Sequence, residues 1–118
     1  PQLGKGADGV SKYICDLPNL TIANAGTTSG AIGGFADARA LMIYAPAALT
    51  GTVTVQVEPT DTGTSWVDYG SGGSDVTIAA GNAVTIEPIS FRQLRLSSSG
   101  AEGAERVFTV TKAFEVGR

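Results

Sequence analysis

Apolar residues in this chain recur at every second position, and not at the 3.6-residue period of a helix. In the stretch 52–58, Val53, Val55 and Val57 fall on one side, and threonine, glutamine and glutamate alternate with them. Side chains of a β-strand point alternately to its two faces, so this spacing predicts a strand with one buried face. Segments of this kind bury their apolar faces by stacking sheet on sheet, which predicts an all-β fold.

The same alternation occurs on both sides of short glycine-containing turns. Residues 75–79 and 83–87 flank Ala-Gly-Asn at 80–82, where glycine and asparagine tolerate the positive φ of a tight β-hairpin. Further strands are predicted at 20–24, 38–45, 65–69, 91–97 and 106–116. We therefore expect an antiparallel β-sandwich or jelly roll over residues 13–118, preceded by a flexible glycine-rich arm at residues 1–12.

Three features leave alternatives open. Residues 34–45 also tolerate a helix, although we favour a strand, and Ala45-Pro46 ends either element. Residues 41–44 are apolar on both faces, which indicates a central strand or a strand whose outer face meets a partner. Lys112 interrupts the apolar face of the last strand, as a bulge or a lysine at the sheet rim would explain.

Length and charge limit the class of protein. The 118 residues are enough for a single domain, and 8 Lys+Arg against 11 Asp+Glu give a formal net charge of −3. A duplex-binding protein is expected to carry a basic face or tail, so we predict no nucleic-acid partner. No apolar run of about 18 residues occurs, which predicts no membrane-spanning helix. The N-terminus has no apolar signal region, and we expect a chain made in the cytoplasm with only an initiator methionine removed.

The residue types needed for common catalytic and metal sites are scarce. Histidine is absent and cysteine occurs once, at Cys15, which excludes histidine-based triads, zinc sites of the histidine or multi-cysteine kinds and an internal disulfide. Pro1 as an N-terminal amine base is disfavoured because a glycine-rich arm follows it. Four carboxylates do not match the spacing of an EF-hand calcium site, so solvated turn residues are favoured: Glu58, Asp61, Asp68 and Asp75. We expect no enzyme activity, no cofactor and no metal.

Aromatic and arginine side chains are the remaining candidates for binding. Trp66 and Tyr69 are three residues apart on one predicted short strand, so they point to opposite faces, one toward the core and one outward. An exposed ring suits stacking against a sugar, but a core tryptophan is the favoured interpretation. Arg92 shares its parity with two leucines, which requires a bulge at the next residue or a place at the rim. Arg92 and Arg95 suit contacts with acidic loops of a neighbouring subunit.

Four segments together resemble a known group of proteins: TVTVQVE at 52–58, DTGTSW at 61–66, DVTIAAGN at 75–82 and FRQLRL at 91–96. Their order over about residues 38–116 resembles small β-sandwich proteins of tailed-bacteriophage virions, typically capsid decoration (cement) proteins or minor head and neck components. The resemblance implies a non-enzymatic structural protein on the outer capsid surface that binds the assembled lattice of the major capsid protein. The same order also resembles carbohydrate-binding sandwiches, so an adhesive virion module, or a neck or tail protein, stays as an alternative.

Candidate partner-binding residues come from three parts of the chain. The arm is expected to order on docking and add a strand to the capsid surface. Residues 41–44 with Leu49 form a candidate self-association patch, and a homo-oligomer would bind the lattice with avidity. The full set of candidates is Gln2, Leu3, Lys5, Leu41, Met42, Tyr44, Leu49, Trp66, Tyr69, Arg92 and Arg95.

Overall fold

The fold is all-β, as the alternating pattern predicts. The computed structural model describes residues 11–35, 38–60, 64–71, 74–87, 89 and 91–116. Its strands are β1 (Ser11–Ile22), β2 (Ala40–Tyr44), β3 (Val53–Glu58), β4 (Val67–Asp68), β5 (Gly70–Ser71), β6 (Ser74–Asp75), β7 (Thr77–Ile78), β8 (Ala83–Ile86), β9 (Gln93–Ser98) and β10 (Arg106–Val116). The described chain contains no helix with the length and hydropathy needed to cross a bilayer.

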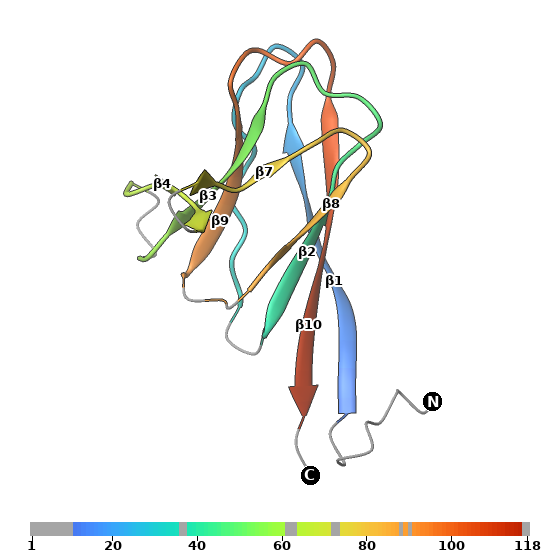
Figure 1. The fold of residues 1–118 in the computed structure, drawn as a ribbon, viewed down its shortest axis with the longest axis vertical. Helices are drawn as coiled ribbons and strands as arrows, with labels where there is room; N and C mark the ends of the chain where they lie inside the picture. Colours follow the sequence, from blue (N-terminus) through green and yellow to red (C-terminus); the bar gives the residue numbers. More distant parts are fainter. Residues whose placement is uncertain are drawn as a thin grey trace.

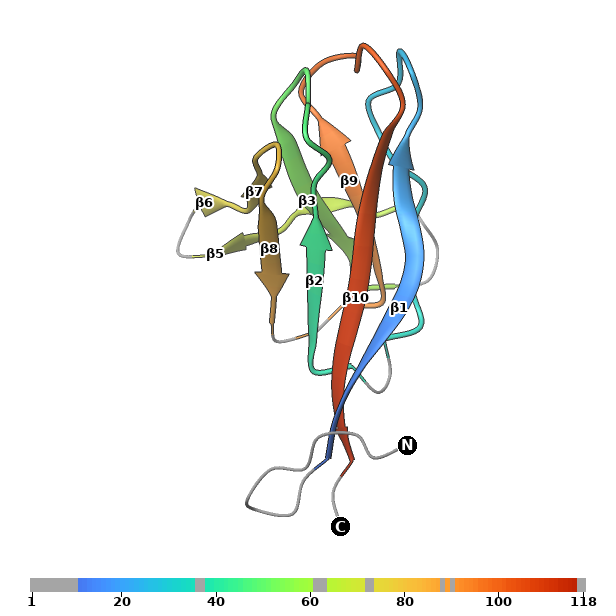
Figure 2. The same ribbon diagram turned by 90° about the vertical axis from the view of Figure 1, so that its right-hand side faces the viewer.

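Two antiparallel sheets stack on each other (Figure 1). The first has the strand order β1-β10-β2-β8. In the second, β9 pairs with one edge of β3 over the whole strand, while β4 and β7 pair with opposite ends of β3. A separate small hairpin joins β5 to β6. β1 and β10 are the longest strands and extend past the second sheet at the end where β1 begins (Figures 1 and 2).

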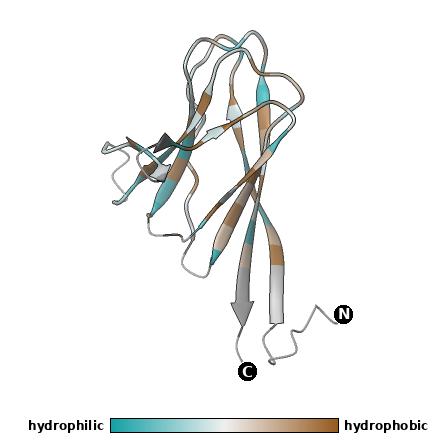
Figure 3. Ribbon diagram, viewed as in Figure 1, coloured by the Kyte–Doolittle hydropathy of each residue, from teal (hydrophilic) through white to brown (hydrophobic). Residues whose placement is uncertain are grey.

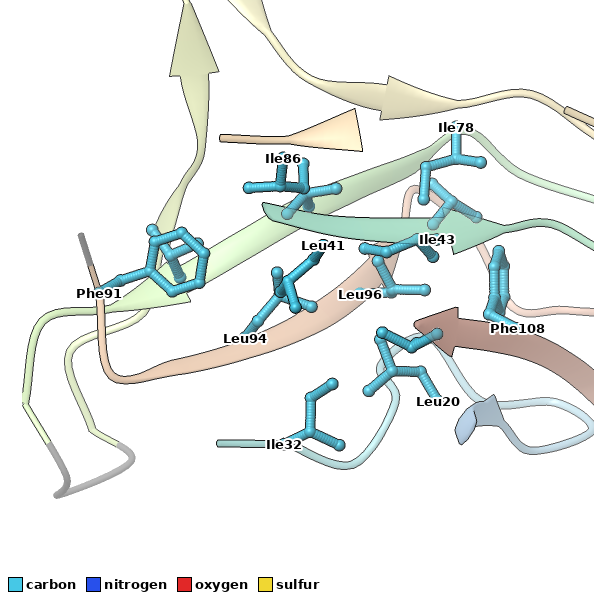
Figure 4. Packing of buried hydrophobic residues seen from close by; sticks show 14 of the residues in the cluster. Leu20, Ile32, Leu41, Ile43, Ile78, Ile86, Phe91, Leu94, Leu96 and Phe108 are labelled. Carbon is cyan, nitrogen blue, oxygen red and sulfur yellow. The ribbon is translucent and has the colours of Figure 1, made fainter. Parts of the chain in front are cut away.

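The core lies between the two sheets, where alternate side chains of β2, β3 and β9 are buried. Hydropathy changes from residue to residue along the strands (Figure 3), and Leu41 and Ile43 of the first sheet lie near Leu94 and Leu96 of the second (Figure 4). The buried apolar residues are Leu20, Ile22, Ile32, Phe35, Leu41, Ile43, Val53, Val55, Val57, Ile78, Ile86, Phe91, Leu94, Leu96, Phe108 and Val110. Fully burying one such large side chain stabilises the fold by roughly 1.5–3 kcal/mol.

Several sequence predictions are settled by these elements. Residues 40–44 form a strand, so the helix alternative for 34–45 is wrong. Gly81 has the positive φ (74°) expected of the turn at 80–82, but β7 pairs with β3 in the second sheet and β8 pairs with β2 in the first. The turn therefore crosses between the sheets, and the predicted hairpin is wrong. The first strand begins at Ser11, inside the range 1–12 assigned to the arm, and not at residue 20. Lys112 is half-buried opposite Cys15, and the register shift lies at Leu17/Leu20. A bulge at the lysine is therefore wrong.

A buried carboxylate, Glu102, holds together the loops at one end of the sandwich. It accepts hydrogen bonds from the N–H groups of Thr50 (2.8 Å) and Gly51 (2.9 Å), from the Ser98 hydroxyl (2.7 Å) and from Nε of Arg106 (2.9 Å). A Cβ at Gly51 would lie 2.9 Å from the backbone N of Gly100, so no larger residue fits this approach without movement. The network joins the β2–β3 loop to the β9–β10 loop.

Opposing effects set the pKa of Glu102. Burial disfavours the charged form and raises the pKa, but the hydrogen bonds from Thr50, Gly51, Ser98 and Arg106 outweigh it. The pKa is lowered from the ordinary 4.5 to about 2. Because the folded-state value is the lower one, ionised Glu102 stabilises the fold above pH 4.5, and this contribution disappears as the pH falls from 4.5 toward 2.

We predict that Glu102→Gln lowers the free energy of unfolding at neutral pH by about 2–3 kcal/mol, because it places an uncharged amide among donors that require an acceptor. The substitution also removes part of the loss of stability between pH 4.5 and 2. Urea unfolding at a series of pH values measures both effects, with exposed Glu105→Gln as the matched control. A Glu102→Gln protein as stable and as acid-sensitive as the wild type would contradict this role.

Candidate functional site

The outer face of the first sheet is apolar and hollowed. Strand alternation that buries Leu41 and Ile43 turns Met42 and Tyr44 outward, and the register sets Met42 between Thr85 of β8 and Thr111 of β10. Ile14 of β1 lies on the same face, opposite Ala113. A hollow of about 300 Å³ opens there, lined by Ile14, Ala40, Leu41, Met42, Tyr44, Thr85, Thr111 and Ala113. We call the outward-facing residues of β1, β10, β2 and β8 the apolar face.

Large exposed hydrophobic side chains gather on this face. Ile14 is 69% exposed, Tyr44 41% and Val107 39%, and all three belong to the first sheet. Of the large exposed hydrophobic residues in the described chain, only Val67 of β4, 55% exposed, lies elsewhere. Asp16 is the only charged residue among the outward-facing strand residues whose side chains the structure describes. The first sheet therefore presents to solvent an outer face with few charges and several large apolar side chains.

The outer face of the second sheet carries a polar network. The register sets Gln56 of β3 between Asp68 of β4 and Arg95 of β9. The Gln56 amide donates to Oδ1 of Asp68 (2.9 Å), and its Oε1 accepts from Nε of Arg95 (2.8 Å). The Arg95 guanidinium lies over the Trp66 ring, 4.6 Å from Cζ to the ring centroid. These four residues are the Trp66 network.

The Trp66 network fixes the two side chains that most often carry binding energy between proteins. Tryptophan and arginine are enriched among the residues whose truncation costs an interface most. Here Arg95 is held by an amide and by a ring, so less side-chain entropy is lost when a partner binds. The guanidinium also covers one face of the indole ring, which is the kind of surface on which a sugar ring would stack.

The structure separates the predicted partner-binding residues. Leu41 lines the hollow but is 1% exposed, and Leu49 is partly buried against the core, so neither side chain presents much surface for self-association. Met42 and Tyr44 do face outward. Arg92 is exposed just before β9, at the rim, as one of the two alternatives predicts. Gln2, Leu3 and Lys5 lie outside the described residues.

The aromatic pair is arranged differently from the favoured interpretation. Trp66 is half-buried outside the core, so the core-tryptophan interpretation is wrong. Tyr69 instead packs against the core, with its ring 5.9 Å from that of Phe91. β4 contains Val67 and Asp68 alone, so the two aromatic residues flank the strand and do not lie on it.

The carboxylates considered for calcium do not gather in the described part of the chain. No group of three or more histidine, cysteine, aspartate or glutamate residues there is placed to hold a metal ion. Glu58 is buried and accepts hydrogen bonds from the Thr60 hydroxyl and the Ser65 N–H. Asp68 takes part in the Trp66 network, and Asp61 lies outside the described residues.

Sequence reasoning missed Ile14, Val107 and Gln56 as surface residues of interest, and it considered Asp68 only as a calcium ligand or a solvated turn residue. The surroundings of each of these residues depend on the neighbouring strand with which its own strand pairs. A short strand such as β4 has too few residues for its register to be predicted from the sequence. The apolar face had one signal in the sequence, the run 41–44 that is apolar on both sides.

Comparison with known proteins adds a single distant similarity in fold. No protein-family model matches the sequence, and no curated protein matches it. A solved chain from the Bacillus endospore appendages, a family of disulfide-linked pili, is similar with a TM-score of 0.49 and 16% sequence identity. The match covers 98% of this chain and 99% of that chain.

We predict that Arg95→Ala exposes Trp66 and destabilises the fold by about 0.5–1 kcal/mol, the size of a cation–π contact near the surface. The chain contains one tryptophan, so its fluorescence reports on this site alone. Arg95→Ala should increase acrylamide quenching and shift the emission to the red, while Arg92→Ala, the neighbouring arginine outside the network, should leave both unchanged. Identical spectra for wild type and Arg95→Ala would contradict the contact.

Proposed function

We propose that this chain is a non-enzymatic structural protein of a phage virion that binds the assembled capsid lattice from outside, as a decoration protein does. The observation that carries the proposal is the difference between the two outer faces of the sandwich. One presents exposed apolar side chains with a single described charge, and the other presents Trp66 and Arg95 in a fixed network. Both are surfaces of the kind that bind protein.

A decoration protein stabilises a shell by binding the assembled state better than its separate subunits. Binding energy gained only on the assembled lattice shifts the equilibrium toward assembly by mass action. A site that spans two lattice subunits meets this condition, because neither subunit alone offers the whole surface.

The Trp66 network is our candidate for the lattice contact. Its arginine suits a carboxylate on an acidic loop of the capsid protein, and its indole supplies a large contact area. Val67, exposed on the adjacent strand, adds apolar surface next to it. The alternative, binding of a carbohydrate through Trp66 or Tyr69, has less support, since Arg95 covers one face of the first ring and the second packs on Phe91.

The proposal is tested by co-sedimentation of the purified chain with empty heads made without it, from the tailed phage that encodes it. We predict saturable binding, an increase in the temperature at which the heads disassemble, and at least about a 30-fold weaker affinity for Trp66→Ala. Thr77→Ala, an exposed position on β7 of the same sheet, is the matched control and should bind like the wild type.

Absence of binding to heads would overturn the proposal. A selective signal on a glycan array that Trp66→Ala removes would replace it with the carbohydrate-binding alternative.

A further inference from the structure

We infer that the apolar face docks onto the same face of a second copy of this chain, so that two sandwiches stack through their β1-β10-β2-β8 sheets as a two-fold dimer. This goes beyond lattice binding, because it assigns a partner to the sheet that the Trp66 network does not occupy.

The first argument is the placement of exposed apolar side chains. Ile14 and Tyr44 line the hollow of about 300 Å³, and half-buried Met42 lies between them on its floor. Protruding side chains beside a hollow on one surface are self-complementary, since a two-fold axis brings the protrusion of each copy toward the hollow of the other. Methionine adapts its shape to such a contact.

The second argument is charge. In a two-fold contact each residue on the axis meets its own copy, so a charge at the centre of the face would meet the same charge. The two inner strands, β10 and β2, place Ala40, Met42, Tyr44, Thr111 and Ala113 in the central part of the face, all uncharged. Asp16, the single described charge, lies on β1 at the edge of the sheet, where water still reaches it.

The third argument is area. β1 and β10 contain 12 and 11 residues, and β2 and β8 contain 5 and 4. At about 3.3 Å per residue and about 4.8 Å between strands, the sheet face covers about 500 Å². Two such faces together supply about 1,000 Å², the size at which specific interfaces begin. Interfaces of this size belong to the weak, transient class, so we look for the dimer at micromolar concentrations.

The test is sedimentation velocity of the purified full chain over the micromolar concentration range. We predict a monomer–dimer equilibrium that Tyr44→Glu weakens at least about tenfold, because it buries a like-charged pair in the contact. Val67→Glu is the matched control: it changes another exposed hydrophobic residue to the same acid, but on the second sheet. Thr85→Arg, at an exposed position of β8 on the apolar face, should weaken the dimer as well and serves if Tyr44→Glu does not fold.

Three results would overturn the inference: a wild-type chain that stays monomeric throughout, a dimer unaffected by both face variants, or a dimer weakened as much by Val67→Glu. The outcome is separable from the proposed function. If the chain dimerises but does not bind phage heads, the inferred dimer is supported and the proposed function is wrong. If the chain binds phage heads but stays monomeric, the proposed function is supported and the inferred dimer is wrong. If Tyr44→Glu alone then abolishes head binding, the apolar face is the lattice contact.

Discussion

Contact between the inner faces of the two sheets is the interaction on which the rest of this structure depends. Side chains of Leu94 and Leu96 on β9 and of Leu41 and Ile43 on β2 meet in a core that spans every long strand. Because alternate residues of a strand point into this core, the residues between them must point outward. The same alternating pattern that places residues in the core therefore also determines which residues form the two outer faces.

The two outer faces that result differ in kind. On the first sheet the outward positions hold alanine, threonine, methionine and tyrosine, and on the second they hold glutamine, aspartate and arginine. Arg95 is anchored by Gln56 and Trp66, whereas Tyr44 is exposed to a degree that is unusual for a large side chain in the middle of a sheet. We propose that a sandwich with one apolar and one polar face holds a different protein surface on each.

The alternating pattern predicted most of the strands because alternation within a strand involves only residues that are adjacent in the sequence. Strands at 53–58, 83–86 and 106–116 fall within predicted segments, and the strand at 93–98 ends one residue beyond the predicted segment 91–97. The part of β1 before Leu20 was missed because Pro18 and Asn19, residue types that are depleted in strands, interrupt the alternation of Tyr13, Cys15 and Leu17. It forms because β10 supplies its backbone partners. Glu102 is hidden from sequence reasoning for a similar reason: its donors Thr50 and Gly51 are more than fifty positions away.

The sites were less predictable than the fold. Met42 and Tyr44 were predicted because residues 41–44 are apolar on both sides of the strand. A core requires apolar residues on one side only, so the apolar residues on the other side can be recognised in the sequence. Ile14 and Val107 join them only through the order β1-β10-β2, which no local pattern determines. The Trp66 network likewise depends on the register that places Gln56 between two neighbouring strands. Cross-strand neighbours are a property of topology, and topology is set by the whole chain.

We propose that this molecule works by binding protein surfaces with both outer faces of its sandwich. Electron cryomicroscopy of heads saturated with the chain tests the claim most directly. The account predicts ordered density on the outer surface, with the Trp66 network against the lattice and the β1-β10-β2-β8 sheets of two copies stacked on each other. Bare heads, or single copies that leave both faces in solvent, would contradict it.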